Sequence, residues 1–114
     1  MAWKAIHRFA RISPRKVQLV TDMVRGRNVN EALNILKFTP NRAATIVGHV
    51  LTSAVANADD AEADVELLYV QQAFVHEGPT LKRWRPKDRG RVFPIRKRTS
   101  HVTVVVEEAT EATG

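Results

Sequence analysis

The chain has 114 residues, 44% of them hydrophobic, a formal net charge of +6 and no cysteine. Its length fits one domain, residues 1–114, with a modest core. The lack of cysteine excludes a disulfide framework, a Cys-ligated zinc site and a thiol nucleophile. The charged N-terminus and the absence of about 20 consecutive apolar residues predict a soluble cytoplasmic protein with neither a signal peptide nor a membrane partner.

The first two-fifths of the chain predict a strand and two helices. Residues 2–12 alternate loosely between apolar and polar side chains, as a short strand does. A helix is expected to begin at Ser13-Pro14, because a serine side chain accepts from free amides and proline is tolerated at the first helical position. Gly26 suits the end of this helix. A second helix is expected from an Asn30 cap to Thr39-Pro40.

The third predicted helix is the clearest element. Its apolar residues recur every three or four positions, which indicates a central place in the core. They are Ala43, Val47, Val50, Leu51, Ala54 and Ala58. Gly48 lies among them and costs roughly 1 kcal/mol relative to alanine, which suggests that another backbone passes close to it. Residues 57–64 are small and acidic and are expected to form a turn.

Two β-like runs follow this turn. Residues 65–76 have apolar side chains on both alternating sides, so their sequence does not indicate which face is buried. Residues 102–106 are β-branched throughout and predict the last strand. Residues 107–114 are acidic and small, and they are expected to fray. The order βαααββ predicts an α+β body in which three helices accompany a three-stranded antiparallel sheet.

The positive charge is concentrated in residues 78–101, called the arm below. The arm has nine of the eighteen lysines and arginines and a single acid, Asp88, for a net charge of +8, whereas the other 90 residues sum to −2. Since the arm joins two strand runs and has no continuous apolar face, it is predicted to be a long antiparallel hairpin that projects from the body. Each leg would span roughly 30 Å. The turn residues Lys87, Asp88, Arg89, Gly90 and Arg91 are expected at its tip.

A self-repelling cationic hairpin is expected to need a polyanion, and folded RNA can enclose it. The alternative is a solvated loop or a localisation signal. Trp84 fits stacking on a base or on the opposite leg. A second basic cluster, Arg8, Arg11, Arg15 and Lys16, surrounds the Ser13-Pro14 helix start. It could bind phosphate there or consist of plain exposed cations.

The sequence offers little that points to catalysis. The four histidines lack ligand spacing, and the acidic residues 59–66 lack the glycine and terminal glutamate of an EF-hand. No phosphate-binding glycine loop is present. We therefore expect no enzyme, no cofactor and no metal. Two alternatives to RNA binding remain: a helix-turn-helix DNA-binding regulator and a small metal-dependent nuclease.

Five sequence blocks resemble the bacterial large-subunit ribosomal protein L twenty-two family. They are Ser13-Pro14-Arg15-Lys16-Val17, Val24-Arg25-Gly26, Ala54-Val55-Ala56-Asn57-Ala58, Glu77-Gly78-Pro79 with Leu81-Lys82-Arg83, and Lys97-Arg98-Thr99-Ser100-His101-Val102-Thr103-Val104. The resemblance spans nearly the whole chain. It implies a structural protein of the large ribosomal subunit that binds 23S-type rRNA and supports early assembly. It also implies a hairpin that lines the nascent-peptide tunnel beside ribosomal protein L four. No homo-oligomer is expected.

The expected rRNA-binding residues come from both basic segments. They are Lys82, Arg83, Trp84, Arg85, Lys87, Arg89, Arg91, Arg96, Lys97, Arg98, His101, Arg8, Arg11, Arg15 and Lys16. The sequence departs from the family pattern at Asp88 and at Val92-Phe93-Pro94. Because proline cannot donate to a strand ladder, Pro94 favours a break in the outgoing leg of the hairpin.

Overall fold

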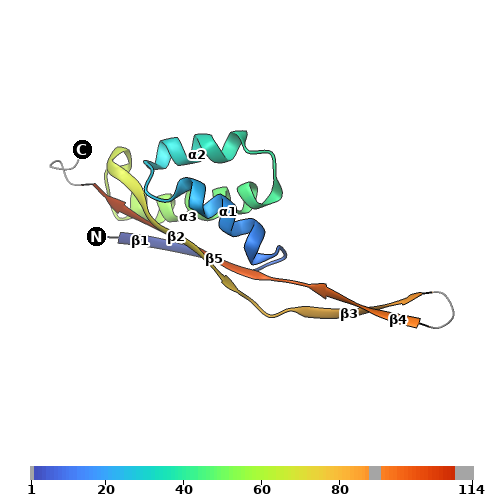
Figure 1. Cartoon of the computed structure of the whole chain (residues 1–114). Helices are drawn as coiled ribbons and strands as arrows, with labels where there is room; N and C mark the ends of the chain where they lie inside the picture. Colours follow the sequence, from blue (N-terminus) through green and yellow to red (C-terminus); the bar gives the residue numbers. More distant parts are fainter. Residues whose placement is uncertain (1, 88–90, 110–114) are drawn as a thin grey trace.

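The computed structural model describes residues 2–87 and 91–109, and it leaves the side chains of residues 81–96 outside the description (Figure 1). Within these residues the chain forms an α+β body and a projecting two-stranded ribbon, as predicted. The body comprises β1 (Ala2–Ala10), α1 (Pro14–Val24), α2 (Val29–Phe38), α3 (Arg42–Asp60), β2 (Leu68–Glu77) and β5 (Ser100–Glu108). The ribbon comprises β3 (Leu81–Lys87) and β4 (Arg91–Lys97).

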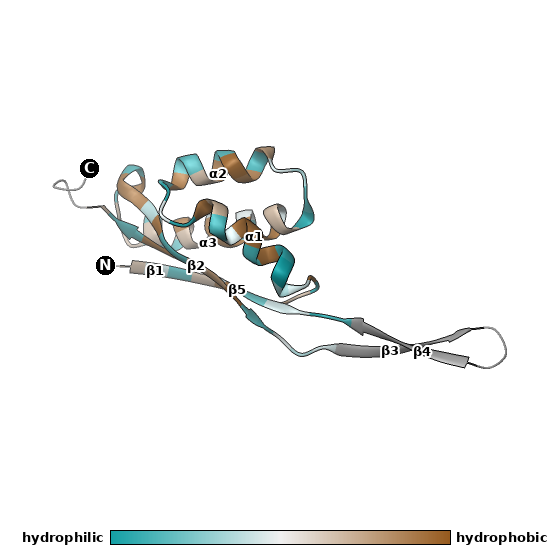
Figure 2. Cartoon of the chain, viewed as in Figure 1, coloured by the Kyte–Doolittle hydropathy of each residue, from teal (hydrophilic) through white to brown (hydrophobic). Residues whose placement is uncertain are grey.

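The body is a helical layer on one face of an antiparallel sheet with the strand order β1-β5-β2 (Figure 1). The central strand β5 contributes Val102, Val104 and Val106, which are fully buried. Helix α3 packs on β1 and β5, and α1 packs on β2. Figure 2 shows apolar stretches along the helices and the sheet and a hydrophilic first turn of α1.

The prediction for α3 is confirmed, since all six of its predicted core residues are buried. The prediction for Gly48 is wrong. A Cβ atom added to Gly48 would meet only the side-chain atom Leu36 Cδ1, at 4.0 Å, and no neighbouring backbone. This glycine is therefore not required by a close approach of two chain segments.

The helix ends differ from the sequence expectations in two details. Helix α2 begins two residues early, because the Asn28 side chain, not that of Asn30, is the cap and accepts from the backbone N–H of Asn30 at 2.8 Å. In the part of the chain described, the Ser13 side chain makes no capping hydrogen bond. Gly26 follows α1 as expected, with φ +83° and its N–H donating to Val70 O at 2.8 Å.

Strand β2 begins later than predicted and changes its buried face. Residues Val65–Leu67 form a 3-10 turn rather than strand. The register of β2 against β5 shifts between Val70 and Gln72, so a β-bulge lies there. Leu68 and Val70 are buried before the bulge and Ala73 after it. The extra residue reverses the alternation, which explains why the apolar residues of this run occupy both sides.

Strand β5 continues further than predicted, through Glu108. Glu107 lies opposite Ala2 of β1 and Tyr69 of β2, and Glu108 lies opposite Leu68. These two residues are therefore part of the sheet rather than of a frayed tail, and residues 110–114 lie outside the described residues. The Tyr69 hydroxyl donates to Glu107 Oε2 at 3.3 Å.

The ribbon continues unbroken through Pro94, so the expected break in the outgoing leg is wrong. Pro94 lies opposite Trp84, and Pro86 lies opposite Val92, two positions along the ladder. Antiparallel pairs alternate between hydrogen-bonded and non-hydrogen-bonded types, so both prolines belong to pairs of the same type. Since proline cannot donate, that type is the non-hydrogen-bonded one, and the ladder tolerates both.

The root of the arm is fixed to the body by a set of short hydrogen bonds. The buried Thr99 hydroxyl donates to Pro79 O at 2.6 Å, and the Gly78 N–H donates to Thr99 O at 2.9 Å. The fully buried Ser100 hydroxyl donates to Ile12 O at 2.6 Å. These bonds tie both legs of the arm to each other and to the segment that precedes α1.

Substitution of Gly78 by alanine should destabilise the protein. The added Cβ would lie 2.5 Å from Thr99 Oγ1 and 3.3 Å from ring atoms of His101, so the Thr99 hydrogen bond would be displaced. We expect the free energy of unfolding in urea to fall by about 1–3 kcal/mol. Gly48→Ala is the matched control and should leave stability unchanged or raise it by up to about 1 kcal/mol. Wild-type stability of Gly78→Ala would contradict the contact at the root.

The Tyr69–Glu107 pair predicts a loss of stability at alkaline pH. Burial raises the pKa of Tyr69 above 10.0, and the charge of Glu107 and their hydrogen bond raise it further. The stabilisation is complete below the pKa of the unfolded chain and disappears as pH rises through the higher folded-state pKa. The Tyr69→Phe variant should be less stable than wild type at lower pH, and the difference between their free energies of unfolding should shrink as pH increases in this range. Urea unfolding measures this difference. Because the chain has one tyrosine, phenolate absorbance reports its ionisation directly, and an unshifted titration would contradict the pairing.

Candidate nucleic-acid interface

The arm projects away from the body as predicted, as a two-stranded ribbon (Figure 1). The molecule measures 67 × 25 × 18 Å and has a radius of gyration of 17.4 Å, whereas a compact domain of this size has about 13–14 Å. The antiparallel ladder pairs Leu81 with Lys97 and continues to Lys87 opposite Arg91. Because the ribbon has two strands, the outer backbone edge of each strand faces the surroundings.

The predicted arm residues other than His101 fall into three groups. Those on the paired backbone of β3 and β4, with side chains outside the description, are Lys82, Arg83, Trp84, Arg85, Lys87, Arg91 and Arg96. The tip residues Asp88, Arg89 and Gly90 lie outside the described residues. The side chains of Lys97 and Arg98, at the root, are exposed.

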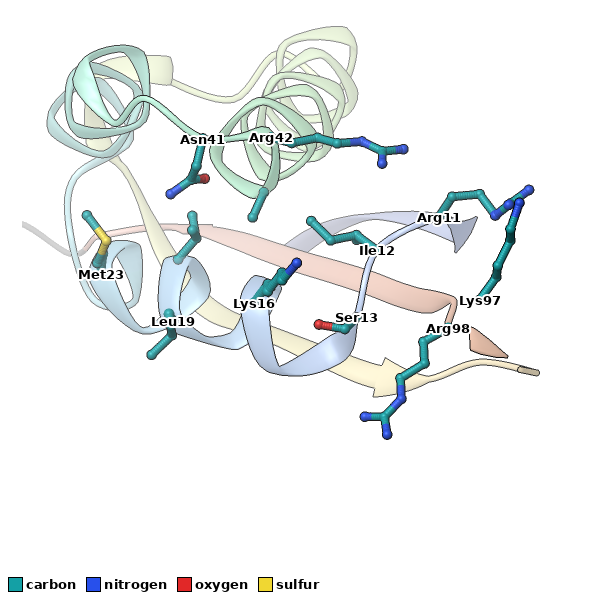
Figure 3. A pocket seen from close by; sticks show the side chains of 12 residues that line it. Arg11, Ile12, Ser13, Lys16, Leu19, Met23, Asn41, Arg42, Lys97 and Arg98 are labelled. Atoms are coloured by element: carbon teal, nitrogen blue, oxygen red, sulfur yellow. The ribbon is translucent and has the colours of Figure 1, made fainter. Parts of the chain in front are cut away.

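A basic groove of about 910 Å³ opens at the root of the arm (Figure 3). Five cations line it: Arg11, Lys16, Arg42, Lys97 and Arg98. They come from segments far apart in the sequence, namely the bend after β1, the first turn of α1, the start of α3 and the junction of β4 with β5. The fold thus joins part of the second basic cluster to the base of the arm.

Local structure explains how these cations converge. Arg11 lies in the tight bend where the N–H of Ile12 donates to Ala10 O at 2.8 Å. Lys16 lies in the first turn of α1, and Arg42 is the first residue of α3, directly after the Asn41 cap. Both helices therefore begin at the groove with cations in place of the acids that would favour their dipoles. A bound anion would be stabilised by the cations and by the helix ends together.

The groove also has an apolar part. It is formed by Ile12, Leu19, Val20, Met23 and Ala43, and the polar residues Ser13 and Asn41 lie among them. Within the described residues, no aspartate or glutamate lines this groove. The electrostatic potential inside it is therefore positive, and its surface is not uniformly hydrophilic.

Three predicted residues lie apart from this groove. Arg8 lines a separate small hollow of about 290 Å³ with His7 and His49. Arg15 is exposed on α1 outside the lining of either hollow. His101 is half-buried and has a structural contact, since its Nδ1 accepts from the backbone N–H of Phe9 at 3.1 Å.

Sequence reasoning missed the groove residues Arg42 and Asn41, and it assigned no site role to the apolar residues of the lining. Arg42 is an isolated cation in the sequence, so it belonged to neither basic cluster. The only local signal was that Asn41 precedes a strongly periodic helix and could cap it, which its side chain does by accepting from Ala44 N at 2.7 Å. That cap determines where α3 begins and so places Arg42 at the groove.

Five acidic residues lie at the end of the body opposite the arm. Asp59 and Asp60 end α3, Asp64 and Glu66 lie at the 3-10 turn, and Glu108 ends β5. The N–H of Asp64 donates to Glu108 Oε1 at 3.3 Å, so the two segments are adjacent. This acidic cluster lies at the end of the body far from the ribbon (Figure 1).

Other functional sites find no support in the part of the chain that the structure describes. No group of three or more potential ligand side chains is placed to hold a metal ion among these residues. Likewise, no described helix is both long and apolar enough to cross a membrane. Helix α3 has Arg42 as its sole lysine or arginine, so it lacks the basic surface of a DNA-recognition helix.

Comparison with known proteins identifies the family. The model of the family described as Ribosomal protein L22p/L17e matches residues 5–107. The chain is 55% identical over 109 residues to large ribosomal subunit protein uL22 of Clostridium novyi (strain NT), which covers 95% of this chain and 98% of the relative. The uL22 proteins of Clostridium tetani and Clostridium acetobutylicum are 55% and 51% identical over the same length. The match over nearly the whole chain confirms the resemblance seen in its sequence blocks, and the chain belongs to the ribosomal protein L22p/L17e family.

Proposed function

We propose that this protein is a structural constituent of the large ribosomal subunit and binds its rRNA through the arm and the basic groove. Its family membership and the names of its relatives support this role. The protein therefore acts in the ribosome in the cytoplasm and has no catalytic activity of its own. Its partners are rRNA and other proteins of the subunit.

The observation that supports RNA binding most directly is the combination of charge and shape at the arm. Nine cations and one acid lie in residues 78–101, and most of them are on a ribbon that leaves the body. An isolated two-stranded ribbon is marginally stable in water, and repulsion between its cations weakens it further. Phosphates on both sides would offset that repulsion, and folded RNA can supply them.

The contacts that we propose follow from these positions. Arm cations from Lys82 to Arg98 would neutralise phosphates along the ribbon, and Trp84 would stack on a base. Arg11, Lys16 and Arg42 would bind phosphates where the arm meets the body. Arg8 and Arg15 would contribute weaker, separate contacts. His101 would act indirectly, by holding Phe9 and the root of the arm in place.

The family resemblance supports a more specific placement, which we also propose. The arm would extend inward through rRNA and line the nascent-peptide tunnel beside ribosomal protein L four, with residues 87–91 at the inner end. The described ribbon, together with a molecular length of 67 Å, suits a contact far from the body. Early binding to rRNA would support assembly of the subunit, because a long arm must be enclosed before the RNA around it closes.

Replacement of arm arginines should flatten the salt dependence of rRNA binding. For Arg83→Gln with Arg85→Gln, we expect the slope of log affinity against log salt concentration to fall by about 0.7–0.9 for each phosphate that the variant no longer neutralises. The measurement is a titration of large-subunit rRNA fragments with the whole protein over a range of salt concentrations.

The matched control for this prediction removes two cations elsewhere on the body, Lys4→Gln with Lys37→Gln. This control should keep the wild-type slope, because both residues lie outside the groove. An arm variant with an unchanged slope would exclude the arm as the binding element. Failure of the wild-type protein to sediment with large subunits at low salt would exclude the proposed function itself.

A further inference from the structure

The apolar side of the basic groove is not explained by phosphate binding alone. Leu19 and Met23 lie one turn apart on α1 and line the groove, and they are 67% and 39% exposed. Single exposed apolar residues are common on protein surfaces. Here two of them are adjacent, in a hollow whose deeper wall includes Ile12 at 9% exposure. A concave surface that combines apolar side chains with convergent polar groups is typical of a binding site.

Among the described residues, the cations around this surface have no carboxylate partner. The ion pairs found within the described residues are Arg25–Asp22 and Arg27–Glu31, which lie outside the groove. Figure 3 shows the charged ends of Arg11, Arg42 and Lys97 together on one side of the groove, away from Leu19 and Met23. A ligand that suits both features must have negative charge in one part and a flat or apolar group in another.

We infer that the groove holds one unpaired nucleotide of the RNA, with its base against Leu19, Met23 and Ile12 and its flanking phosphates on the surrounding cations. This inference rests on the proposed function. A volume of about 910 Å³ lies within the roughly 300–1,000 Å³ of small-molecule sites, so a nucleotide fits. Bases splayed out of single-stranded loops and bulges are the usual targets of specific RNA recognition.

A paired helix suits the groove less well. Its bases are stacked, so it would present only its sugar-phosphate surface and leave Leu19 and Met23 against polar groups. An acidic protein segment could also combine charge with apolar side chains. The RNA chain is favoured because the groove cations Lys97 and Arg98 continue directly into the basic arm. One polyanion can then cover both surfaces without interruption.

Two polar side chains could bind the edge of the base. The Asn41 carbonyl oxygen is engaged with Ala44 N, which leaves the Asn41 amide N–H groups as donors. The Ser13 hydroxyl, which makes no helix-capping hydrogen bond in the described structure, also lies at the groove. Hydrogen bonds from these groups would orient the base, while the apolar contact would supply the preference for an unpaired base.

The test compares two hairpin RNAs of equal length, one fully paired and one with a single bulged 2-aminopurine. The whole wild-type protein should bind the bulged RNA roughly tenfold more tightly, as expected for one additional base contact, and should change the 2-aminopurine fluorescence. Leu19→Gln with Met23→Gln should abolish both the preference and the fluorescence change. Its salt dependence should stay that of wild type, because no cation is removed.

Phe38→Gln is the matched control, since Phe38 is 79% exposed and lies outside the groove. This variant should keep the preference for the bulged RNA. Equal urea midpoints of the three proteins would show that the effect is not one of folding. A wild-type protein that binds both RNAs equally, or a Leu19/Met23 variant that keeps the preference, would overturn the inference and leave the proposed function intact.

Two other outcomes would also overturn the inference. A labelled peptide of alternating glutamate and leucine that binds wild type but not the Leu19/Met23 variant, without any preference for the bulge, would assign the groove to an acidic protein segment. Failure to bind either hairpin or an rRNA fragment at low salt would reject the RNA-binding function together with the inference.

Discussion

The pairing of β5 with both β1 and β2 is the constraint on which the remainder of the structure depends. This strand supplies fully buried valines to the core. Its first residue, Ser100, donates to Ile12 O, and the preceding Thr99 donates to Pro79 O, so the start of the strand fixes the root of the arm. The same strand therefore stabilises the body and orients the ribbon relative to it. A change that shifted the register of β5 would turn its valines away from the helices and misdirect the arm at once.

The body and the arm are stabilised by different interactions. The helices and the sheet bury enough apolar surface to hold their own geometry. The ribbon has the hydrogen bonds of a hairpin but a sequence dominated by cations, so its stability depends on the anions around it. The hydrogen bonds of Gly78, Thr99 and Ser100 lie at the boundary between the body and the arm. Through these bonds the rigid body orients the ribbon, which is fully stabilised only when anions surround it.

Much of the fold could be predicted because its signals are local. The spacing of apolar residues in α3 identified six of its seven buried positions and missed Ala44. The tethered cluster of cations indicated a projecting hairpin. The buried face of β2 could not be predicted, because the β-bulge between Val70 and Gln72 moves burial from one side to the other. The start of α2 was misjudged because Asn28 and Asn30 are equally good caps in sequence.

The groove could be predicted only in part, because it is a product of tertiary structure. Arg11 and Lys16 were recognisable as a cluster, and Lys97 and Arg98 as part of the arm. Tertiary structure brings these four cations together, and Arg42 joins them because of where α3 starts relative to β5. Arg8, Arg15 and His101 were equivalent to the others in sequence, yet the fold directs them elsewhere or uses them to support the backbone.

The acidic cluster at one end of the body and the nine cations of the arm would together give the molecule a dipole moment along its longest dimension. In the field of a polyanion such a molecule experiences a torque, so it would rotate during its diffusional approach and arrive with the ribbon leading. The trailing carboxylates would be repelled by the same field and would remain turned toward bulk solvent. Charge placement alone would thus select the direction of insertion before any specific contact has formed.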